Sequence, residues 1–189
     1  MDRIAAGLAV ALIAAGLPAD AARQEPLPAG TQAPEISGTT LDGRSLKLSA
    51  LRGKKVVAVV FLSHLCALST RALPDLQKLH AELSPQKGFT LVGVAVDDEA
   101  KAVKSYVAEH GVTFPVIRDG EYQVVKAYGP QVTPTVFLVG RSGKILRWYA
   151  GFTKQTVPAL RADAKAAVAG RPPRSSKPVR GLGCVIAVD

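Results

Sequence analysis

The sequence predicts an α/β fold with a mixed central sheet, helices on both faces of the sheet and an N-terminal β-hairpin extension. Apolar runs without polar alternation are typical of central strands buried on both faces. Three such runs occur, at residues 56–62, 89–96 and 135–139. Segments with apolar residues at helical spacing separate them, which is the pattern of strands alternating with helices.

The first elements follow from local signals. Asp42-Gly43 lies between two short extended stretches and predicts a hairpin turn. After the strand at 56–62, residues 66–83 carry leucines near helical spacing, and Pro74 within them predicts a kinked helix. After the strand at 89–96, Asp97 and Asp98 are expected to cap a helix that ends at Gly111.

The helices and strands predicted for the second half of the domain are mostly shorter. We expect an extended stretch at 114–118 and a short helix at 121–128. A hairpin that turns at Ser142-Gly143 should cover 135–150, and the last helix should cover 154–168.

The length of 189 residues fits one domain with tails. Residues 1–21 resemble a cleavable signal peptide, because a basic start precedes an apolar run and a small-residue cleavage pattern. An uncleaved membrane-surface anchor is the alternative. We divide the rest into a linker at 22–30, the domain at 31–169 and a Pro/Arg-rich tail at 170–189. The protein is therefore predicted to be exported, either periplasmic or secreted.

The formal net charge of +9 has no single source. Four basic residues lie in the tail, which could make a weak contact with anionic membrane surfaces or could be a solvated segment. Aromatic residues make up 5% of the chain and are not interleaved with basic ones, so we expect no nucleic-acid partner.

We also expect no cofactor and no metal, since only His64 offers a second soft ligand near Cys66.

The residues around Cys66 resemble those of thioredoxin-like proteins. Phe61-Leu62-Ser63-His64-Leu65-Cys66 is similar to the strand-to-helix turn that carries the reactive cysteine, and Pro74 stands where that family has its kink proline. Thr133-Pro134-Thr135 resembles the family's cis-proline loop. The segments at 30–34 and 51–54 are similar to the redoxin and peroxiredoxin-like (AhpC/TSA-type) branch, and the resemblance covers roughly residues 30–169.

Physical reasons accompany the resemblance. A cysteine in the first turn of a helix meets free backbone N–H groups and the positive end of the helix dipole, which favour the nucleophilic thiolate. A proline after Thr133 can be cis and can leave backbone exposed for pairing with an extended thiol substrate. We therefore expect Thr133 and Pro134 to shape the substrate groove.

The sequence also departs from the family's common dithiol pattern. Ser69 stands where a Cys-x-x-Cys motif has its second cysteine, Leu65 replaces the usual tryptophan, and Val60 replaces the usual buried acid. A standard dithiol reductase would lack both its resolving thiol and its proton acceptor.

A peroxiredoxin-like activity would need only one attacking cysteine. Ser63 occupies the position of the family's hydroxyl residue, but Val59 replaces the upstream proline. The resemblance also implies an arginine near the thiolate, and Arg71, Arg118 and Arg141 are the candidates.

Cys184 follows a segment, Gly181-Leu-Gly, that is similar to the tail of exported redoxin-domain proteins, which makes it a candidate resolving thiol. It could instead form a structural disulfide with Cys66, form an intermolecular link or remain idle. His64 could stabilise the thiolate or shuttle a proton, or it could be an ordinary surface histidine. Ser69 could hydrogen-bond the thiolate or be a simple helix residue.

The sequence thus predicts an exported thiol-based oxidoreductase. Cys66 would attack a peroxide or the disulfide of a protein or small molecule, with Ser63 or Ser69 positioning the reacting atoms, and Cys184 or an external reductant would restore the thiol. The alternatives are a non-catalytic binding module that has lost its dithiol and a carrier that forms mixed disulfides through Cys66.

Overall fold

The centre of the fold is strand β3, Val56–Leu62, which is buried along its whole length. The computed structural model describes residues 25–83 and 88–188, so the predicted signal peptide and part of the linker lie outside the described residues. Alternate residues of a strand face opposite sides of a sheet. Val60 belongs to one apolar cluster and Phe61 to the other. Two apolar layers on this strand explain why its sequence has no polar alternation.

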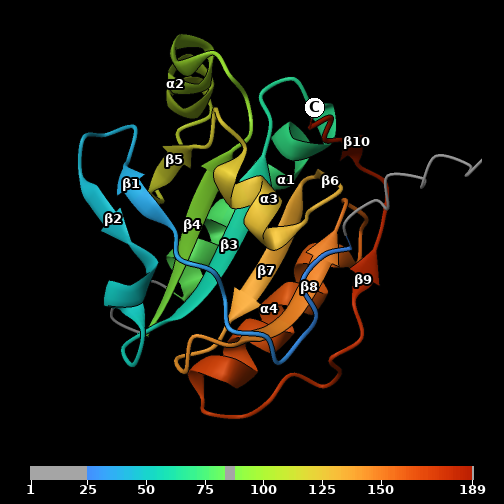
Figure 1. The fold of residues 1–189 in the computed structure, drawn as a ribbon. Coiled ribbons are helices and arrows are strands. Elements are labelled where there is room, and N and C mark those ends of the chain that lie inside the picture. Colours follow the sequence, from blue (N-terminus) through green and yellow to red (C-terminus); the bar gives the residue numbers. More distant parts are fainter. Residues whose placement is uncertain (1–24, 84–87, 189) are drawn as a thin grey trace, which may run out of the picture.

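Six strands form the main sheet, in the order β5-β4-β3-β7-β8-β9 (Figure 1). The pairs β3–β4, β4–β5 and β8–β9 are parallel, whereas β7 is antiparallel to both β3 and β8. The sheet is therefore mixed, as predicted. The other strands are β4 at Phe89–Ala95, β5 at Val116–Arg118, β7 at Thr135–Val139, β8 at Ile145–Ala150 and β9 at Val179–Arg180.

Helices cover both faces of this sheet, which confirms the predicted layers. Helices α1 (Ala67–Glu82), α4 (Thr156–Val168) and α2 (Ala100–Glu109) contribute to one apolar cluster. Helix α3 (Gln123–Tyr128) packs on the opposite face (Figure 1). None of the helices in the described part of the chain is long and apolar enough to cross a membrane.

The predicted N-terminal hairpin is present. Strands β1 (Ser37–Thr39) and β2 (Ser45–Lys47) pair antiparallel and lead into a 3-10 turn at Leu48–Leu51. Leu46 and Leu48 from this region join the apolar cluster on the α3 side. The hairpin thus helps α3 to cover that face.

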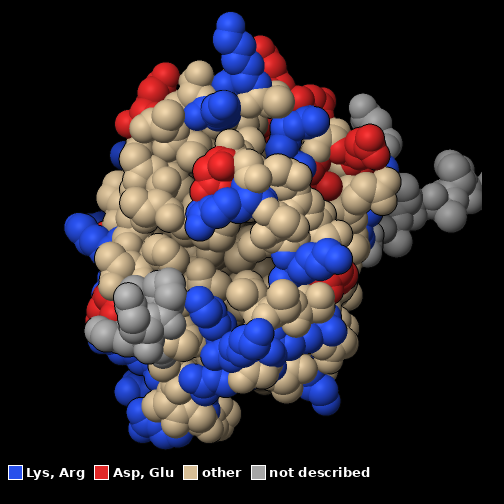
Figure 2. Space-filling model, turned by 90° about the vertical axis from the view of Figure 1, so that its left-hand side faces the viewer, with Lys and Arg blue, Asp and Glu red and all other residues tan. Residues whose placement is uncertain are grey.

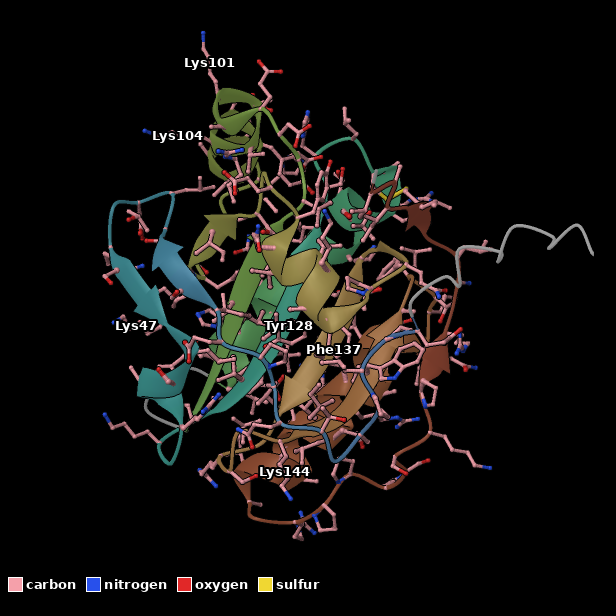
Figure 3. All side chains as sticks on the ribbon, in the orientation of Figure 1. Lys47, Lys101, Lys104, Tyr128, Phe137 and Lys144 are labelled. Carbon is pink, nitrogen blue, oxygen red and sulfur yellow. A yellow bond between two sulfur atoms is a disulfide. The ribbon has the colours of Figure 1, made fainter. Side chains whose placement is uncertain are left out.

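An aromatic group fills the layer beneath α3. The rings of Tyr128 and Phe137 lie 5.2 Å apart, and Phe61 lies within 5.8 Å of both (Figure 3). The Tyr128 hydroxyl donates a hydrogen bond to the carbonyl oxygen of Pro34 at 2.8 Å. Burial raises the pKa of Tyr128 well above its usual range. This packing ties α3 and the N-terminal segment to the sheet.

Basic side chains are distributed over the surface. Figure 2 shows Lys and Arg in several places on one face, with a run of neighbouring basic side chains in its lower half. Lys47, Lys101, Lys104 and Lys144 point outward around the molecule (Figure 3). The positive charge is therefore a property of the surface as a whole, and the tail carries only a share of it.

The tail differs from the sequence-based expectation. It showed no periodicity, yet it contains β9 and a second short strand, β10 (Cys184–Val185). Strand β10 pairs with β6 (Val132–Thr133) in a separate two-stranded sheet. Main-chain hydrogen bonds hold both strands, so their side chains need no apolar pattern.

Candidate redox site

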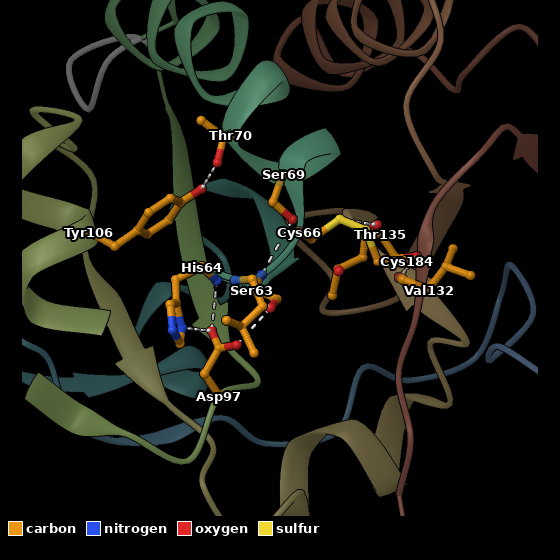
Figure 4. The surroundings of a disulfide bond; sticks show 12 residues. Ser63, His64, Cys66, Ser69, Thr70, Asp97, Tyr106, Val132, Thr135 and Cys184 are labelled. Atoms are coloured by element: carbon orange, nitrogen blue, oxygen red, sulfur yellow. Dashed lines mark hydrogen bonds and ion pairs between the residues drawn. A yellow bond between two sulfur atoms is a disulfide. The ribbon is translucent and has the colours of Figure 1, made fainter. Parts of the chain in front are cut away.

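Cys66 and Cys184 form a disulfide in this structure, with their Cα atoms 5.9 Å apart and a separation of 118 positions in sequence (Figure 4). The sequence left the pairing of these residues open. The fold brings them together because the tail crosses the sheet edge at β8 and then reaches the start of α1.

Cys66 is the N-cap residue of α1 and is 1% exposed. Its carbonyl oxygen accepts hydrogen bonds from the N–H groups of Ser69 and Thr70, which begin the helix. The first turn contains no acidic side chain. When the disulfide is reduced, the positive end of the helix dipole therefore stabilises negative charge on the Cys66 sulfur, with no carboxylate in that turn to oppose it.

Cys184 is held by strand pairing. It lies opposite Thr133 in the antiparallel register, and Val185 lies opposite Val132. The pairing extends in both directions, because Ile186 N–H donates to the Gln131 carbonyl and Phe152 N–H donates to the Leu182 carbonyl. Main-chain hydrogen bonds on both sides of Cys184 therefore hold it next to Cys66.

Glycines allow this close approach. A Cβ atom on Gly183 would lie 2.7 Å from Cβ and Cγ2 of Val132 and 3.0 Å from the Thr133 carbonyl oxygen. Gly151 has a φ of +72°, and a Cβ there would lie 2.4 Å from the Leu182 carbonyl oxygen. Only residues without a side chain fit at these two points of contact.

Thr133 and Pro134 are buried beside the disulfide, and the peptide bond between them is cis, as predicted. The Cys66 Sγ lies 3.3 Å from the Thr133 carbonyl oxygen. This is a packing contact in the disulfide form, because the sulfur carries no proton to donate. The Pro134 carbonyl accepts a hydrogen bond from Gly151 N–H at 2.7 Å, which fixes the loop to the end of β8.

Ser63, His64 and Asp97 form a polar cluster in the loop before Cys66. The Ser63 hydroxyl donates to Asp97 Oδ1 at 2.6 Å and accepts from Leu65 N–H at 3.1 Å. The other carboxylate oxygen of Asp97 accepts from His64 N–H at 2.9 Å. Asp97 is 7% exposed, so it anchors the loop from inside the protein.

Ser69 also supports this loop. It is fully buried, and its hydroxyl oxygen accepts a hydrogen bond from Ser63 N–H at 3.3 Å. The position that would hold the second cysteine of a Cys-x-x-Cys motif therefore links the first turn of α1 to the end of β3.

The His64 ring lies on the side of Asp97 that faces α2, and the disulfide lies on the other side of Ser63 (Figure 4). Its Nδ1 is 3.2 Å from Asp97 Oδ2, although the geometry is not that of a hydrogen bond. Ser63, Cys66, Asp97 and Cys184 line a hollow of about 230 Å³. His64 instead lines a second hollow of about 380 Å³ beside Tyr106.

The candidate arginines lie elsewhere. Arg71 is exposed on α1, Arg118 donates to the Asp98 carbonyl, and Arg141 donates to the Val168 carbonyl. None of the arginines in the described part of the chain lines the hollow at the disulfide. Within residues 25–83 and 88–188, no group of three His, Cys, Asp or Glu side chains could hold a metal ion.

Two features of the site were missed from the sequence. Asp97 was expected to cap α2, but the N-cap of that helix is Glu99 and has no side-chain capping bond. Asp97 follows β4, which is parallel to β3, so both strands end at the same edge of the sheet. This shared edge could have indicated that Asp97 lies close to the loop before Cys66. The tail glycines had no such signal, since their role depends on contacts with Val132 and Leu182.

A family model described as Redoxin matches residues 28–167, which is well over half of the chain. The chain belongs to the Redoxin family. This confirms the resemblance drawn from the residues around Cys66 and Pro134.

Relatives of this Redoxin chain include proteins described as thiol-disulfide oxidoreductase ResA. The protein from Halalkalibacterium halodurans is 32% identical over 130 residues, covering 68% of this chain and 73% of the relative. The one from Bacillus subtilis is 30% identical, covering 69% and 72%.

Solved structures agree with the Redoxin assignment. A thiol:disulfide interchange protein of the thioredoxin family from Chlorobium tepidum has a TM-score of 0.64 at 27% identity, covering 76% of this chain and 97% of that one. An uncharacterized conserved protein from Geobacillus kaustophilus has a TM-score of 0.76 at 24% identity, covering 86% and 93%. The latter supports the fold alone.

Proposed function

We propose that this protein is a thiol–disulfide oxidoreductase whose redox pair is Cys66 and Cys184. The observation that carries the proposal is the bond between a cysteine at the N-terminus of α1 and a cysteine held on the β6 edge. Reduction would add two electrons and two protons and give two thiols. Oxidation of the pair would return those electrons to a substrate disulfide.

Cys184 replaces the resolving cysteine that Ser69 does not provide. Ser69 is buried and bonded to Ser63, whereas Cys184 is already bonded to Cys66. A resolving cysteine on a separate segment can move away when the pair is reduced. Cys66 would then be uncovered, and its thiolate could attack the disulfide of a protein substrate beside Thr133 and Pro134.

A peroxide substrate is less well supported. Ser63 was the candidate for holding a peroxide oxygen, but its hydroxyl proton is donated to Asp97. Among residues 25–83 and 88–188, no arginine lines the hollow to stabilise the leaving oxygen. The names of the relatives also refer to thiol–disulfide chemistry rather than peroxidase chemistry.

We also propose that the protein works outside the cytoplasm, together with an external reductant. Stable disulfides form in oxidising compartments, and the basic start and apolar run at residues 1–21 fit export. A weak contact of the tail with an anionic membrane surface remains a prediction.

The deciding experiment measures the redox equilibrium of the pair. The protein is equilibrated in glutathione buffers of graded potential, alkylated and weighed intact, with Cys66→Ser and Cys184→Ser as controls. Reversible two-electron exchange above about −300 mV is expected, because structural disulfides of secreted proteins lie below that potential. A bond that stays closed across the whole series would favour the non-catalytic binding module.

A second measurement separates the substrates. Reduced Cys184→Ser is exposed to one equivalent of hydrogen peroxide or to insulin, whose disulfides serve as protein substrates. A mixed disulfide with an insulin chain, without oxidation by peroxide, is expected. A sulfenic acid on Cys66 without any mixed disulfide would favour the peroxidase.

A further inference from the structure

The two sulfurs of the disulfide have different surroundings. Cys66 is 1% exposed, and its Sγ lies against the Thr133 carbonyl oxygen at 3.3 Å. Cys184 is partly exposed, and its neighbour Val185 is 65% exposed. An attacking thiolate that approached Cys66 would meet a buried sulfur and a nearby carbonyl oxygen, which repels negative charge.

Both cysteines line the hollow beside the bond, but most of the exposed residues around it belong to the Cys184 segment. Cys184, Val185 and Ala187 line it together with Leu65, which is 82% exposed. These rim residues lie at the surface, so an incoming thiol can reach Cys184 without moving the core.

The leaving group also differs between the two directions of attack. Thiolates that are better stabilised leave faster in thiol–disulfide exchange. Cys66 caps the 16-residue helix α1, whereas Cys184 lies in a two-residue strand. Departure of Cys66 as the thiolate therefore benefits from the helix dipole.

We propose that an external thiolate opens the disulfide at Cys184 and that Cys66 is the leaving group. The proposal rests on the redox role proposed above. In the first step, the incoming thiolate forms a bond to the Cys184 sulfur while the Cys66–Cys184 bond breaks and its electron pair leaves on Cys66. In the second, another thiolate attacks the incoming sulfur, releases the reductant as its disulfide and leaves Cys184 as a thiolate that takes up a proton.

The tail can stay attached to the domain while Cys184 is bonded to the reductant. Arg147 donates from Nε to the Lys177 carbonyl at 2.6 Å, and β9 pairs with β8 at Tyr149 and Ala150. These contacts do not involve Cys184. When the disulfide opens, residues 183–186 can leave the β6 edge while the preceding segment stays anchored to β8. The reductant would thus meet Cys184, and the substrate would meet Cys66.

The test uses glutathione as the monothiol. Oxidised protein is mixed with reduced glutathione, quenched with N-ethylmaleimide at early times and mapped by peptide mass spectrometry, with the values extrapolated to zero time. Glutathione on Cys184 with maleimide on Cys66 is expected to exceed the opposite pattern by about tenfold or more. The matched control repeats the reaction in guanidinium chloride, where the two patterns should be nearly equal.

Two outcomes contradict the proposal in different ways. Glutathione mainly on Cys66, or the same ratio as in guanidinium chloride, overturns the assigned direction and leaves the redox role intact. A native bond that glutathione does not open, although it opens in guanidinium chloride, overturns the redox role together with this proposal.

Discussion

Cys184 lies directly opposite Thr133 in the β10–β6 pairing, and the carbonyl oxygen of this same Thr133 lies 3.3 Å from the Cys66 sulfur. One residue therefore positions both partners of the disulfide. Docking of the tail and closure of the bond are thermodynamically linked, since whatever loosens the ladder lowers the effective concentration of one thiol near the other.

Gly183→Ala should make the disulfide easier to reduce. The added Cβ would lie 2.7 Å from two atoms of Val132, and overpacking of this kind typically destabilises by about 1–3 kcal/mol. The thiol–disulfide equilibrium in glutathione buffers should shift toward the dithiol by about 5- to 150-fold.

Gly38→Ala is the matched control for this substitution. Gly38 lies in β1 with open space around its Cβ position, so the redox equilibrium should stay unchanged. If the two alanine variants had the same midpoint, the close contact at Val132 would not govern docking of the tail.

Asp97→Ala should loosen the loop that leads to Cys66. The substitution removes the acceptor of the Ser63 hydroxyl and of His64 N–H, and an unsatisfied buried donor costs about 1–3 kcal/mol. Urea denaturation should show this loss in the free energy of unfolding.

Asp98→Ala serves as the control, because the Asp98 side chain is exposed and should contribute no more than about 0.5 kcal/mol. If the two variants had equal free energies of unfolding, Asp97 would not anchor the loop.

Reduction of the disulfide should lower the stability of the whole domain. The bond closes a loop between residues 118 positions apart, which in the chain-entropy model contributes about 4–5 kcal/mol. Urea denaturation of oxidised and reduced protein measures the difference. The double variant Cys66→Ser/Cys184→Ser, without reductant, should match the reduced protein, and a double variant as stable as the oxidised protein would argue against the estimate.

His80 should make stability depend on pH. Burial, with a smaller contribution from Lys55, lowers the pKa of His80 below 6.5, and its Nδ1 accepts a hydrogen bond from Leu91 N–H. The unfolded chain therefore binds the proton first as pH falls. The contribution of His80 is complete above about pH 6.5 and is lost as pH falls toward its folded pKa.

The measurement compares urea denaturation of wild type and His80→Gln between pH 5 and 8. The variant should lose part of the acid-side slope of the stability profile. Parallel pH profiles for the two proteins would contradict the assignment.

The main sheet and helices could be predicted because their signals are local. Residues 56–62 had to be a central strand, since seven consecutive apolar positions need cover on both faces. The position of Cys66 at the start of a helix and the cis bond before Pro134 were predicted because the residues around them resemble those of thioredoxin-like proteins.

The remainder of the site depends on contacts between distant residues. Asp97 binds a serine 34 positions earlier, and an aspartate before a helix has the same local pattern as a cap. The β10–β6 pair rests on main-chain hydrogen bonds and one covalent bond, so no side-chain periodicity marks it. The need for glycine at position 183 is visible only in the folded protein, where Val132 lies against it.

The disulfide also has a consequence for biosynthesis. Cys184 follows every other element of the domain along the chain, so Cys66 emerges from the ribosome long before its partner is made. These are the only two cysteines in the sequence, and a single chain therefore has no wrong pairing available to it. Oxidative folding of this protein needs no reshuffling within one molecule, and any misdirected bond must join two molecules.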